Sequence, residues 1–256
     1  MIFSDVAEAY RRTRKPKDIL WNRLVARPLA APFVVLLART AVTPNQITLG
    51  TLVVFVAGAV VLALCPGRSA LVGAAAIIEL SYVFDCVDGQ LARLKKLSSP
   101  VGAHLDFLMD ELKAFLLVAA VGVRLWRASA DPRFLLEALL GLVAVASAIS
   151  LTTFVRRPEY AAATGVRAGQ GAGDYGAGFD DSSAAAPAAA APRSMWLSPL
   201  RALESLGRFL VHYPSYILFV ALFDRIDLFL HVYVAVNAAY AGRSLLGVAV
   251  KLGRRA

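Results

Sequence analysis

Four aspartates stand in two short stretches of an otherwise apolar chain, DCVDGQLAR (85–93) and GAHLDFLMD (102–110). Within each stretch the two aspartates are three or four residues apart, so both project from one face of a helix. The turn between the stretches, KKLSSP (95–100), is short and polar. It predicts an antiparallel hairpin that places all four carboxylates at similar depth, namely those of Asp85, Asp88, Asp106 and Asp110.

This concentration of carboxylates requires positive charge nearby. An ionised side chain in the middle of a membrane costs at least about 2.5 to 3.5 kcal/mol, so unpaired carboxylates would be prohibitive. Arg93 and Lys113 are near, but two counter-ions leave negative charge over once Glu111 is included. Oxygen ligands alone suit Mg²⁺ or Mn²⁺, and such an ion in turn recruits phosphate oxygens. We therefore expect one or two divalent ions here.

Small residues beside the aspartates leave space for a ligand. Gly89 exposes backbone directly after Asp88, and Ala92 leaves room for a flat group to lie on the helix. Gly102 opens the second helix where a side chain would crowd the first. Arg93 offers a planar fork of donors that matches a phosphate. The residues thus predict a phosphate-containing substrate held at the metal-bearing face.

The pattern DxxDGxxAR, eight further residues and GxxxDxxxD resembles the signature of the CDP-alcohol phosphotransferase family, and every fixed position matches. TPNQIT (43–48) is similar to the start of that family's first span, and also reads as a capping box that begins a helix. The resemblance implies an enzyme that transfers a substituted phosphate group from a CDP-linked donor to an alcohol and releases CMP. It also implies a homodimer.

The resemblance further assigns roles to the residues. It implies that Asp85, Asp88 and Asp106 bind one Mg²⁺ or Mn²⁺ and that Asp85, Asp106 and Asp110 bind a second. Asp110 would also be the general base that deprotonates the acceptor. The residues expected to bind the CDP group are Gly89, Ala92, Arg93, Ser99, Gly102, Asn45 and Thr48.

Composition and apolar runs predict an all-α integral membrane protein. The chain has 256 residues, 58% of them hydrophobic, and a mean hydropathy of +0.62. Residues 18–39 predict a helix in the membrane interface, because two arginines and two prolines interrupt its apolar run. Six spans are predicted, at 46–65, 70–94, 102–124, 134–155, 209–223 and 228–249.

The basic residues predict the topology. With both termini cytoplasmic, 20 of the 27 Lys and Arg lie on the cytoplasmic side and 5 on the opposite side. The net charge of +9 is therefore attributed to topology and anionic lipid rather than to nucleic acid. The polar, basic start lacks a signal-peptide pattern. We expect a multi-pass protein of a bacterial inner membrane.

The predicted organisation is a cytoplasmic N-terminus with its interfacial helix (1–42) and one membrane domain (43–256). Within that domain, a stretch rich in Ala and Gly predicts a flexible cytoplasmic linker at about 158–195. Cys65 and Cys86 fall at opposite ends of different predicted spans, which argues against a disulfide.

The acceptor is left open by the sequence. Polar groups inside spans usually face the protein interior, so we consider an acceptor pocket of Lys113, Arg156, Arg157, His212, Ser215 and Arg243. The acceptor is a small polar alcohol or alcohol phosphate if the donor is CDP-diacylglycerol. Alternatively, CDP activates a water-soluble headgroup and the lipid supplies the hydroxyl. An intramembrane prenyltransferase and a divalent-cation carrier are the more remote alternatives.

Overall fold

The described part of the chain is helical throughout. The computed structural model describes residues 2–13, 18–164 and 209–253, and these contain helices and no strand. In chain order they are α1 (Ile2–Thr13), the π-helix η1 (Asn22–Ala26), α2 (Arg27–Ala38), α3 (Pro44–Leu64), α4 (Arg68–Leu94), α5 (Pro100–Ser129), α6 (Arg133–Val155), α7 (Pro158–Thr164), the 3-10 helix η2 (Tyr213–Ser215), α9 (Ile217–Leu222) and α10 (Ile226–Gly253). The prediction of an all-α fold is confirmed.

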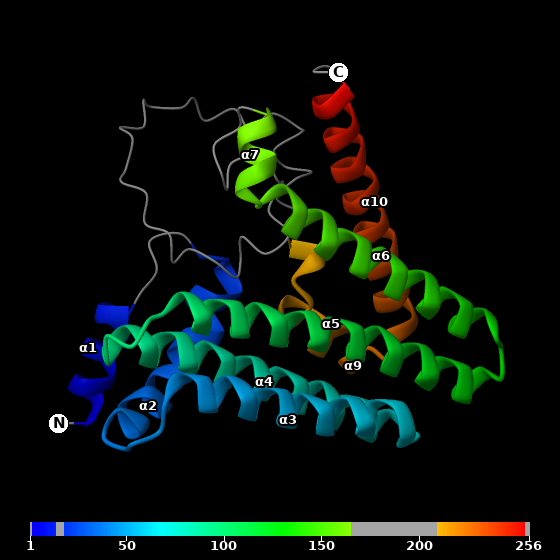
Figure 1. Cartoon of the computed structure of the whole chain (residues 1–256). Coiled ribbons are helices and arrows are strands. Elements are labelled where there is room, and N and C mark those ends of the chain that lie inside the picture. The colour runs from blue at the N-terminus through cyan, green and yellow to red at the C-terminus, as the bar shows by residue number, and fades with distance from the viewer. Residues whose placement is uncertain (1, 14–17, 165–208, 254–256) are drawn as a thin grey trace, which may run out of the picture.

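The long helices are organised around α3 and α6. Helix α3 packs against both α4 and α5, while α6 packs against α5 and α10 (Figure 1). Helices α1 and α2 pack against each other and against α4. They lie at the end of the molecule where α4 leads into α5 (Figure 1). The aspartate-bearing ends of α4 and α5 are therefore next to the N-terminal helices.

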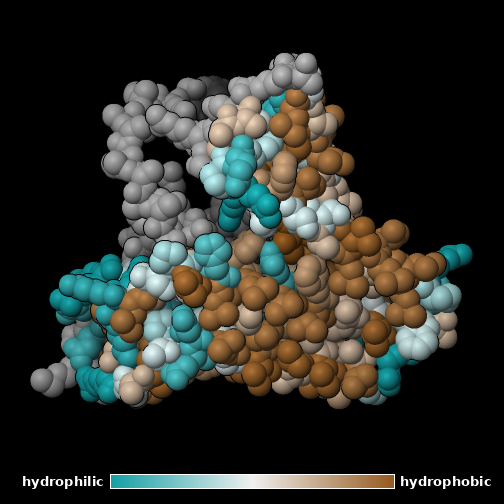
Figure 2. Space-filling view, in the orientation of Figure 1, coloured by the Kyte–Doolittle hydropathy of each residue, from teal (hydrophilic) through white to brown (hydrophobic). Residues whose placement is uncertain are grey.

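Three described helices, α3, α4 and α6, are long and apolar enough to cross a membrane. Helix α5 has 30 residues, but its first half carries the acidic residues of the second signature stretch. Figure 2 shows a broad hydrophobic surface over the middle of the molecule, with hydrophilic residues at both ends of the α3–α5 layer. This distribution is typical of a protein that lies in a lipid bilayer.

The N-terminal region contains one helix more than the prediction. Residues 20–38 form one unbroken helical run inside the predicted 18–39, in which η1 passes directly into α2 and Pro28 lies in the first turn of α2. Helix α1 was missed because a short amphipathic helix with many polar residues lacks the apolar run that marks a span. The N-terminal region is thus a folded part of the molecule.

Two further predictions are wrong in part. The fifth predicted span, 209–223, is not one helix: helical residues 209–211 are followed by η2 and then α9. Pro214 lies at this break, since it lacks the N–H that a continuous helix requires. The predicted linker begins with a helix, α7, and its remaining residues lie outside the described ranges.

The helix ends have local causes. Thr43 and Gln46 form the predicted capping box at the start of α3. Ser99 accepts a hydrogen bond from the N–H of Gly102 at the start of α5. At the other end of α3, the guanidinium of Arg124 donates to the carbonyls of Leu62, Cys65 and Gly67, which satisfies groups that the helix leaves without partners.

Helices α5 and α6 pack closely at a glycine. A Cβ atom added to Gly122 would lie 2.3 Å from the Cβ of Ala138, much closer than two carbon atoms can approach. By contrast, a Cβ atom added to Gly73 on α4 would meet nothing within 4 Å. Small residues at such contacts let the helix backbones pack tightly.

We predict that Gly122→Ala destabilises the protein and that Gly73→Ala does not. The added methyl at residue 122 must push α5 and α6 apart, at a cost of about 1 to 3 kcal/mol. Alanine at residue 73 instead removes a poor helix former. Thermal unfolding of the purified proteins in detergent measures both effects. Equal unfolding temperatures for the two variants would contradict the close packing at Gly122.

Candidate active site

Carboxylates from α4 and α5 meet in one cluster. Each of Asp85, Asp88 and Asp106 offers a carboxylate oxygen, and these three atoms lie within 4.8 Å of one another. The backbones of α4 and α5 do not pack closely together, although α3 packs against both. The space between the two helices is thus available to side chains, and the hairpin is more open than the sequence alone suggested.

The ammonium of Lys113 lies inside this cluster. Its Nζ donates to Asp85 Oδ1 at 2.5 Å and to Asp110 Oδ1 at 3.2 Å. The Lys113 side chain is only 1% exposed. It therefore joins Asp110 on its own helix to Asp85 on the facing helix, and so links the fourth aspartate to the cluster.

Two carboxylate oxygens of the cluster are buried without a hydrogen-bond partner, Asp106 Oδ1 and Asp110 Oδ2. A buried charged oxygen without a partner is costly, so these atoms fit a site that binds a cation. Oxygens on opposite sides of an octahedral Mg²⁺ ion lie about 4.2 Å apart, twice the usual Mg–O distance. The three oxygens of the cluster, which lie within 4.8 Å of one another, are near this separation. The residues present fit a hard divalent ion.

Two hydrogen bonds join the first turns of α3 to α4 beside the cluster. Thr48 Oγ1 donates to Asp88 Oδ2 at 2.6 Å. One turn further along, the carbonyl of Thr51 accepts a hydrogen bond of 2.8 Å from Ser81 on α4. Both threonines are buried. Thr48 was predicted to contact the donor, and its position here fixes the orientation of the Asp88 carboxylate.

Three of the residues predicted to bind the donor lie together where α3 and α5 begin. A Cβ atom added to Gly102 would lie 3.1 Å from Ser99 Oγ and 3.2 Å from Asn45 Oδ1. A side chain at residue 102 would therefore crowd both polar groups. The sequence predicted that Gly102 relieves crowding against α4, whereas the neighbours in the structure are Ser99 and Asn45.

The guanidinium of Arg93 folds back over Gly89. Its two terminal nitrogens lie 3.5 and 3.8 Å from the position that a Cβ atom of Gly89 would take. Its Nε donates to the main-chain carbonyl of Thr13 at 2.9 Å. Ala92 is half-buried and lies one helical turn after Asp88, on the same face. Gly89, Ala92 and Arg93 thus line one side of the cluster.

A small pocket opens on the α5 side of the cluster, next to Asp110. It is lined by Phe107, Asp110, Glu111, Ala114, Ile149, Val211, Tyr213 and Tyr233. The guanidinium of Arg156 lies over the ring of Phe107, 5.7 Å from its centre. Arg156 is therefore next to this pocket, whereas Arg157 and Arg243 are exposed. Tyr213 lies in the stretch HYPSY (212–216), whose polar side chains predicted a cavity for the acceptor. Phe107 and Tyr233 were not among the predicted site residues, because isolated aromatics in an apolar helix give no signal of a pocket.

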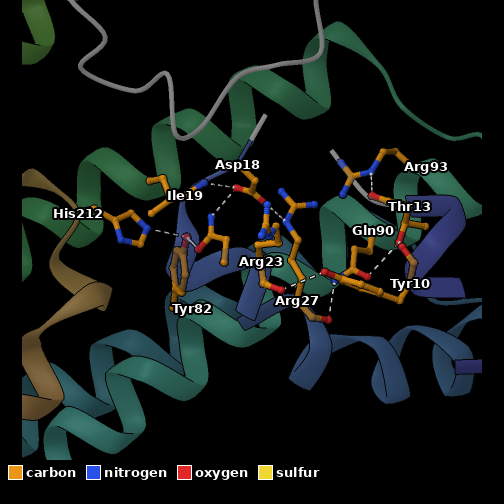
Figure 3. A network of polar contacts seen from close by, with 11 residues as sticks. Tyr10, Thr13, Asp18, Ile19, Arg23, Arg27, Tyr82, Gln90, Arg93 and His212 are labelled. Carbon is orange, nitrogen blue, oxygen red and sulfur yellow. Dashed lines mark hydrogen bonds and ion pairs between the residues drawn. The ribbon is translucent and has the colours of Figure 1, made fainter. Parts of the chain in front are cut away.

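The other two candidate acceptor residues belong to a separate hydrogen-bond network. His212 bonds through Nδ1 to Ser215 Oγ at 2.6 Å and through Nε2 to Tyr82 at 2.7 Å. The hydroxyl of Tyr82 donates to Asn22 Oδ1 at 2.6 Å (Figure 3). Sequence reasoning missed Tyr82 and Asn22. The available signal was that Tyr82 stands three residues before Asp85 and shares its helix face.

Comparison with known protein families gives a match that covers both aspartate stretches. Residues 41–174 match the family model described as CDP-alcohol phosphatidyltransferase. This range covers more than half of the chain and includes both aspartate stretches. No curated protein matches the chain.

We predict that Mg²⁺ raises the unfolding temperature of the metal-free protein and that Asp106→Asn weakens this effect. A ligand present at 100 times its dissociation constant stabilises a fold by about 2.7 kcal/mol. The control is Asp227→Asn, which removes a carboxylate that pairs with Arg225 instead. Equal shifts for the parent and Asp106→Asn would contradict a metal site at this cluster.

We also predict that Lys113→Met destabilises the metal-free protein. Removing one partner from a buried ion pair costs about 3 to 5 kcal/mol, because the remaining charge has no counter-ion. Added Mg²⁺ should reduce the difference in unfolding temperature between the variant and the parent, because the ion supplies positive charge. Lys96→Met, at an exposed position in the turn before α5, is the control. Unfolding of the parent and both variants in detergent, without and with Mg²⁺, gives the six unfolding temperatures to compare.

Proposed function

The chain belongs to the CDP-alcohol phosphatidyltransferase family, and on that premise we propose that it transfers a substituted phosphate group from CDP-diacylglycerol to a small polar alcohol or alcohol phosphate, with release of CMP. The observation that carries this proposal is the convergence of the signature aspartates of α4 and α5 beside Gly89 and Arg93. The reaction is a step of phospholipid biosynthesis, and the enzyme is a phosphotransferase acting on substituted phosphate groups.

We propose that Asp85, Asp88 and Asp106 hold one Mg²⁺ or Mn²⁺ ion and that Asp85, Asp106 and Asp110 hold a second. The clustered carboxylate oxygens and the buried oxygens without partners support this assignment. Bound divalent ions supply positive charge that stabilises the diphosphate of the donor and the departing CMP. The hydrogen bond from Thr48 keeps Asp88 turned toward the cluster.

The donor is bound on the α4 side. Arg93 presents two terminal nitrogens over Gly89, which suits a phosphate approaching the helix at that glycine. Ala92 leaves space beside the backbone for the nucleotide. Asn45, Ser99 and Gly102, which lie together at the starts of α3 and α5, complete the proposed CDP site with Thr48.

Asp110 acts as the general base. It lines the pocket on the α5 side, and its Oδ2 is buried without a hydrogen-bond partner, while Lys113 holds its other oxygen. The acceptor hydroxyl gives its proton to Asp110 as its oxygen bonds to phosphorus. The bond between that phosphorus and the CMP oxygen breaks, and CMP leaves with the bonding electrons. Lys113 positions Asp110 for this step.

The pocket next to Asp110 is the proposed entry for the acceptor. Arg156 beside Phe107 offers a positive charge there for an acceptor that carries a phosphate. Arg157 and Arg243 are exposed on elements that pack near the pocket, so we keep them as candidates for the same role. His212 and Ser215 do not line the pocket, but their neighbour Tyr213 does. We keep them as candidate acceptor-site residues that act by positioning Tyr213.

We propose six spans in a bacterial inner membrane, with both termini in the cytoplasm. The spans would be α3, α4, α5, α6, the broken segment 209–222 and α10. Support comes from the three long apolar helices and from the 20 of 27 basic residues that this topology places inside. The proposed oligomer is a homodimer, as the family resemblance implies.

We predict that the purified protein releases CMP from CDP-diacylglycerol only when Mg²⁺ and an acceptor are both present. Asp110→Asn should lower the rate by about 10² to 10⁴-fold, the usual contribution of a general base. The same variant should still bind CDP-diacylglycerol. The acceptor panel contains inositol phosphate, glycerol phosphate and serine, and released CMP is quantified by chromatography.

Asp227→Asn is the control, because its carboxylate lies in an exposed ion pair away from the cluster. A second set of reactions offers CDP-linked headgroups with a lipid alcohol, which reverses the roles of the two substrates. Turnover only in that second set would overturn the choice of donor. Diphosphate release from a prenyl donor, or ion flux without nucleotide turnover, would overturn the reaction class.

A further inference from the structure

The N-terminal helix reaches the signature arginine. Nε of Arg93 donates a 2.9 Å hydrogen bond to the main-chain carbonyl of Thr13, the last residue of α1 (Figure 3). The two residues are 80 positions apart in the sequence. A guanidinium N–H is a strong donor, so Arg93 is a well-matched partner for this main-chain carbonyl.

The end of α1 is itself fixed to α4. The hydroxyl of Thr13 lies between two acceptors, the carbonyl of Ala9 at 2.8 Å and Gln90 Oε1 at 3.0 Å, and it shares its proton between them. Gln90 follows the signature glycine directly. Gln90 Nε2 in turn donates to the carbonyl of Arg27 at 3.3 Å. Thr13 is 1% exposed and Gln90 is fully buried. These bonds give Thr13 one position relative to the helix face that carries Gly89 and Arg93.

A fixed Nε determines where the rest of the guanidinium lies, because the group is planar. With Nε bonded to Thr13, the two terminal nitrogens lie over Gly89, at 3.5 and 3.8 Å from the position that its Cβ atom would take. An arginine free in solvent would lose rotamer freedom on binding a phosphate. An arginine already held in the binding orientation loses less, and the donor binds more tightly.

The N-terminal segment also contacts α4 on the other side of the aspartates. Arg27 Nε forms an ion pair with Asp18, and Asp18 Oδ1 accepts a 3.1 Å bond from Asn22 Nδ2. Asn22 Oδ1 accepts from Tyr82, one turn before Asp85 (Figure 3). The segment thus spans α4 from Tyr82 to Arg93. This arrangement makes the position of α1 depend on a buried polar network rather than on one exposed contact.

We propose that α1 is a structural part of the donor site, in which Thr13 and Gln90 are positioning residues that orient Arg93 toward the diphosphate of the CDP-linked donor. This inference rests on the proposed function and deepens it. Helix α1 contributes to the recognition of the nucleotide-linked substrate without contacting the reacting atoms. It does not contribute to the binding of the acceptor.

The test compares Thr13→Val and Gln90→Leu with the parent in the CMP-release assay. Each variant removes an anchor of α1 and leaves Arg93 unchanged. KM for the CDP-linked donor should rise by about 3- to 10-fold, the effect of losing a typical hydrogen bond, with kcat and the acceptor KM within about twofold of the parent. Thr13→Ser keeps the hydroxyl and should restore the parental donor KM.

A double-mutant cycle separates positioning from a general loss of stability. In an Arg93→Ala background, Thr13→Val should cause no further rise in donor KM, because the side chain that it orients is gone. Tyr10→Phe is the control on the same helix, since the Tyr10 hydroxyl bonds to the carbonyl of Arg23 instead. It should leave the donor KM unchanged. The Mg²⁺-induced thermal shift verifies that each variant is folded.

An unchanged donor KM in both Thr13→Val and Gln90→Leu would overturn the proposal. The proposal would also be overturned if Thr13→Val raised the donor KM equally in the parent and in the Arg93→Ala background. If Gln90→Leu does not fold, Thr13→Val and its cycle with Arg93→Ala still decide the matter. A parent protein that releases no CMP from any CDP-linked donor would refute the proposed function itself, which is a separate outcome.

Discussion

Four carboxylates gathered between two helices of an apolar bundle impose the constraint on which the structure depends. Negative charge of this density requires compensation inside the protein, because lipid and apolar side chains supply none. Lys113 provides one positive charge by joining Asp85 to Asp110. The remaining oxygens, two of them buried without partners, are left for cations. The proposed metal site therefore rests on the same electrostatics that would otherwise destabilise the fold.

Tight helix packing and the space around the carboxylates lie in different halves of the helices. Close contacts at Gly58 with Ile78 and at Gly122 with Ala138 lie in the halves of the helices away from the aspartates. Near the aspartates, α4 and α5 remain apart and α3 packs against both. The tight contacts give the bundle its rigidity, and the open end provides space for a substrate. Thr48 on α3 then orients one carboxylate within that space.

The N-terminal helices α1 and α2 pack against α4 at the open end of the bundle. They pack against α4 through buried polar groups on both sides of its aspartates, from Tyr82 to Arg93. Buried polar networks of this kind are specific, since each unpaired member would cost free energy. The N-terminal region is consequently packed against the helix face that the signature residues occupy.

The sequence by itself determined the helical class, the ends of α3, α4 and α6 and the capping box at Thr43, because apolar runs and caps act over a few neighbouring residues. The spacing of the aspartates also determined their faces, and the signature indicated the family. Only the tertiary structure decided that Lys113 lies among the carboxylates, that His212 bonds to Tyr82 and that Arg93 bonds to Thr13. These contacts join residues 28 to 130 positions apart, so they depend on how whole helices pack, and no local pattern encodes them.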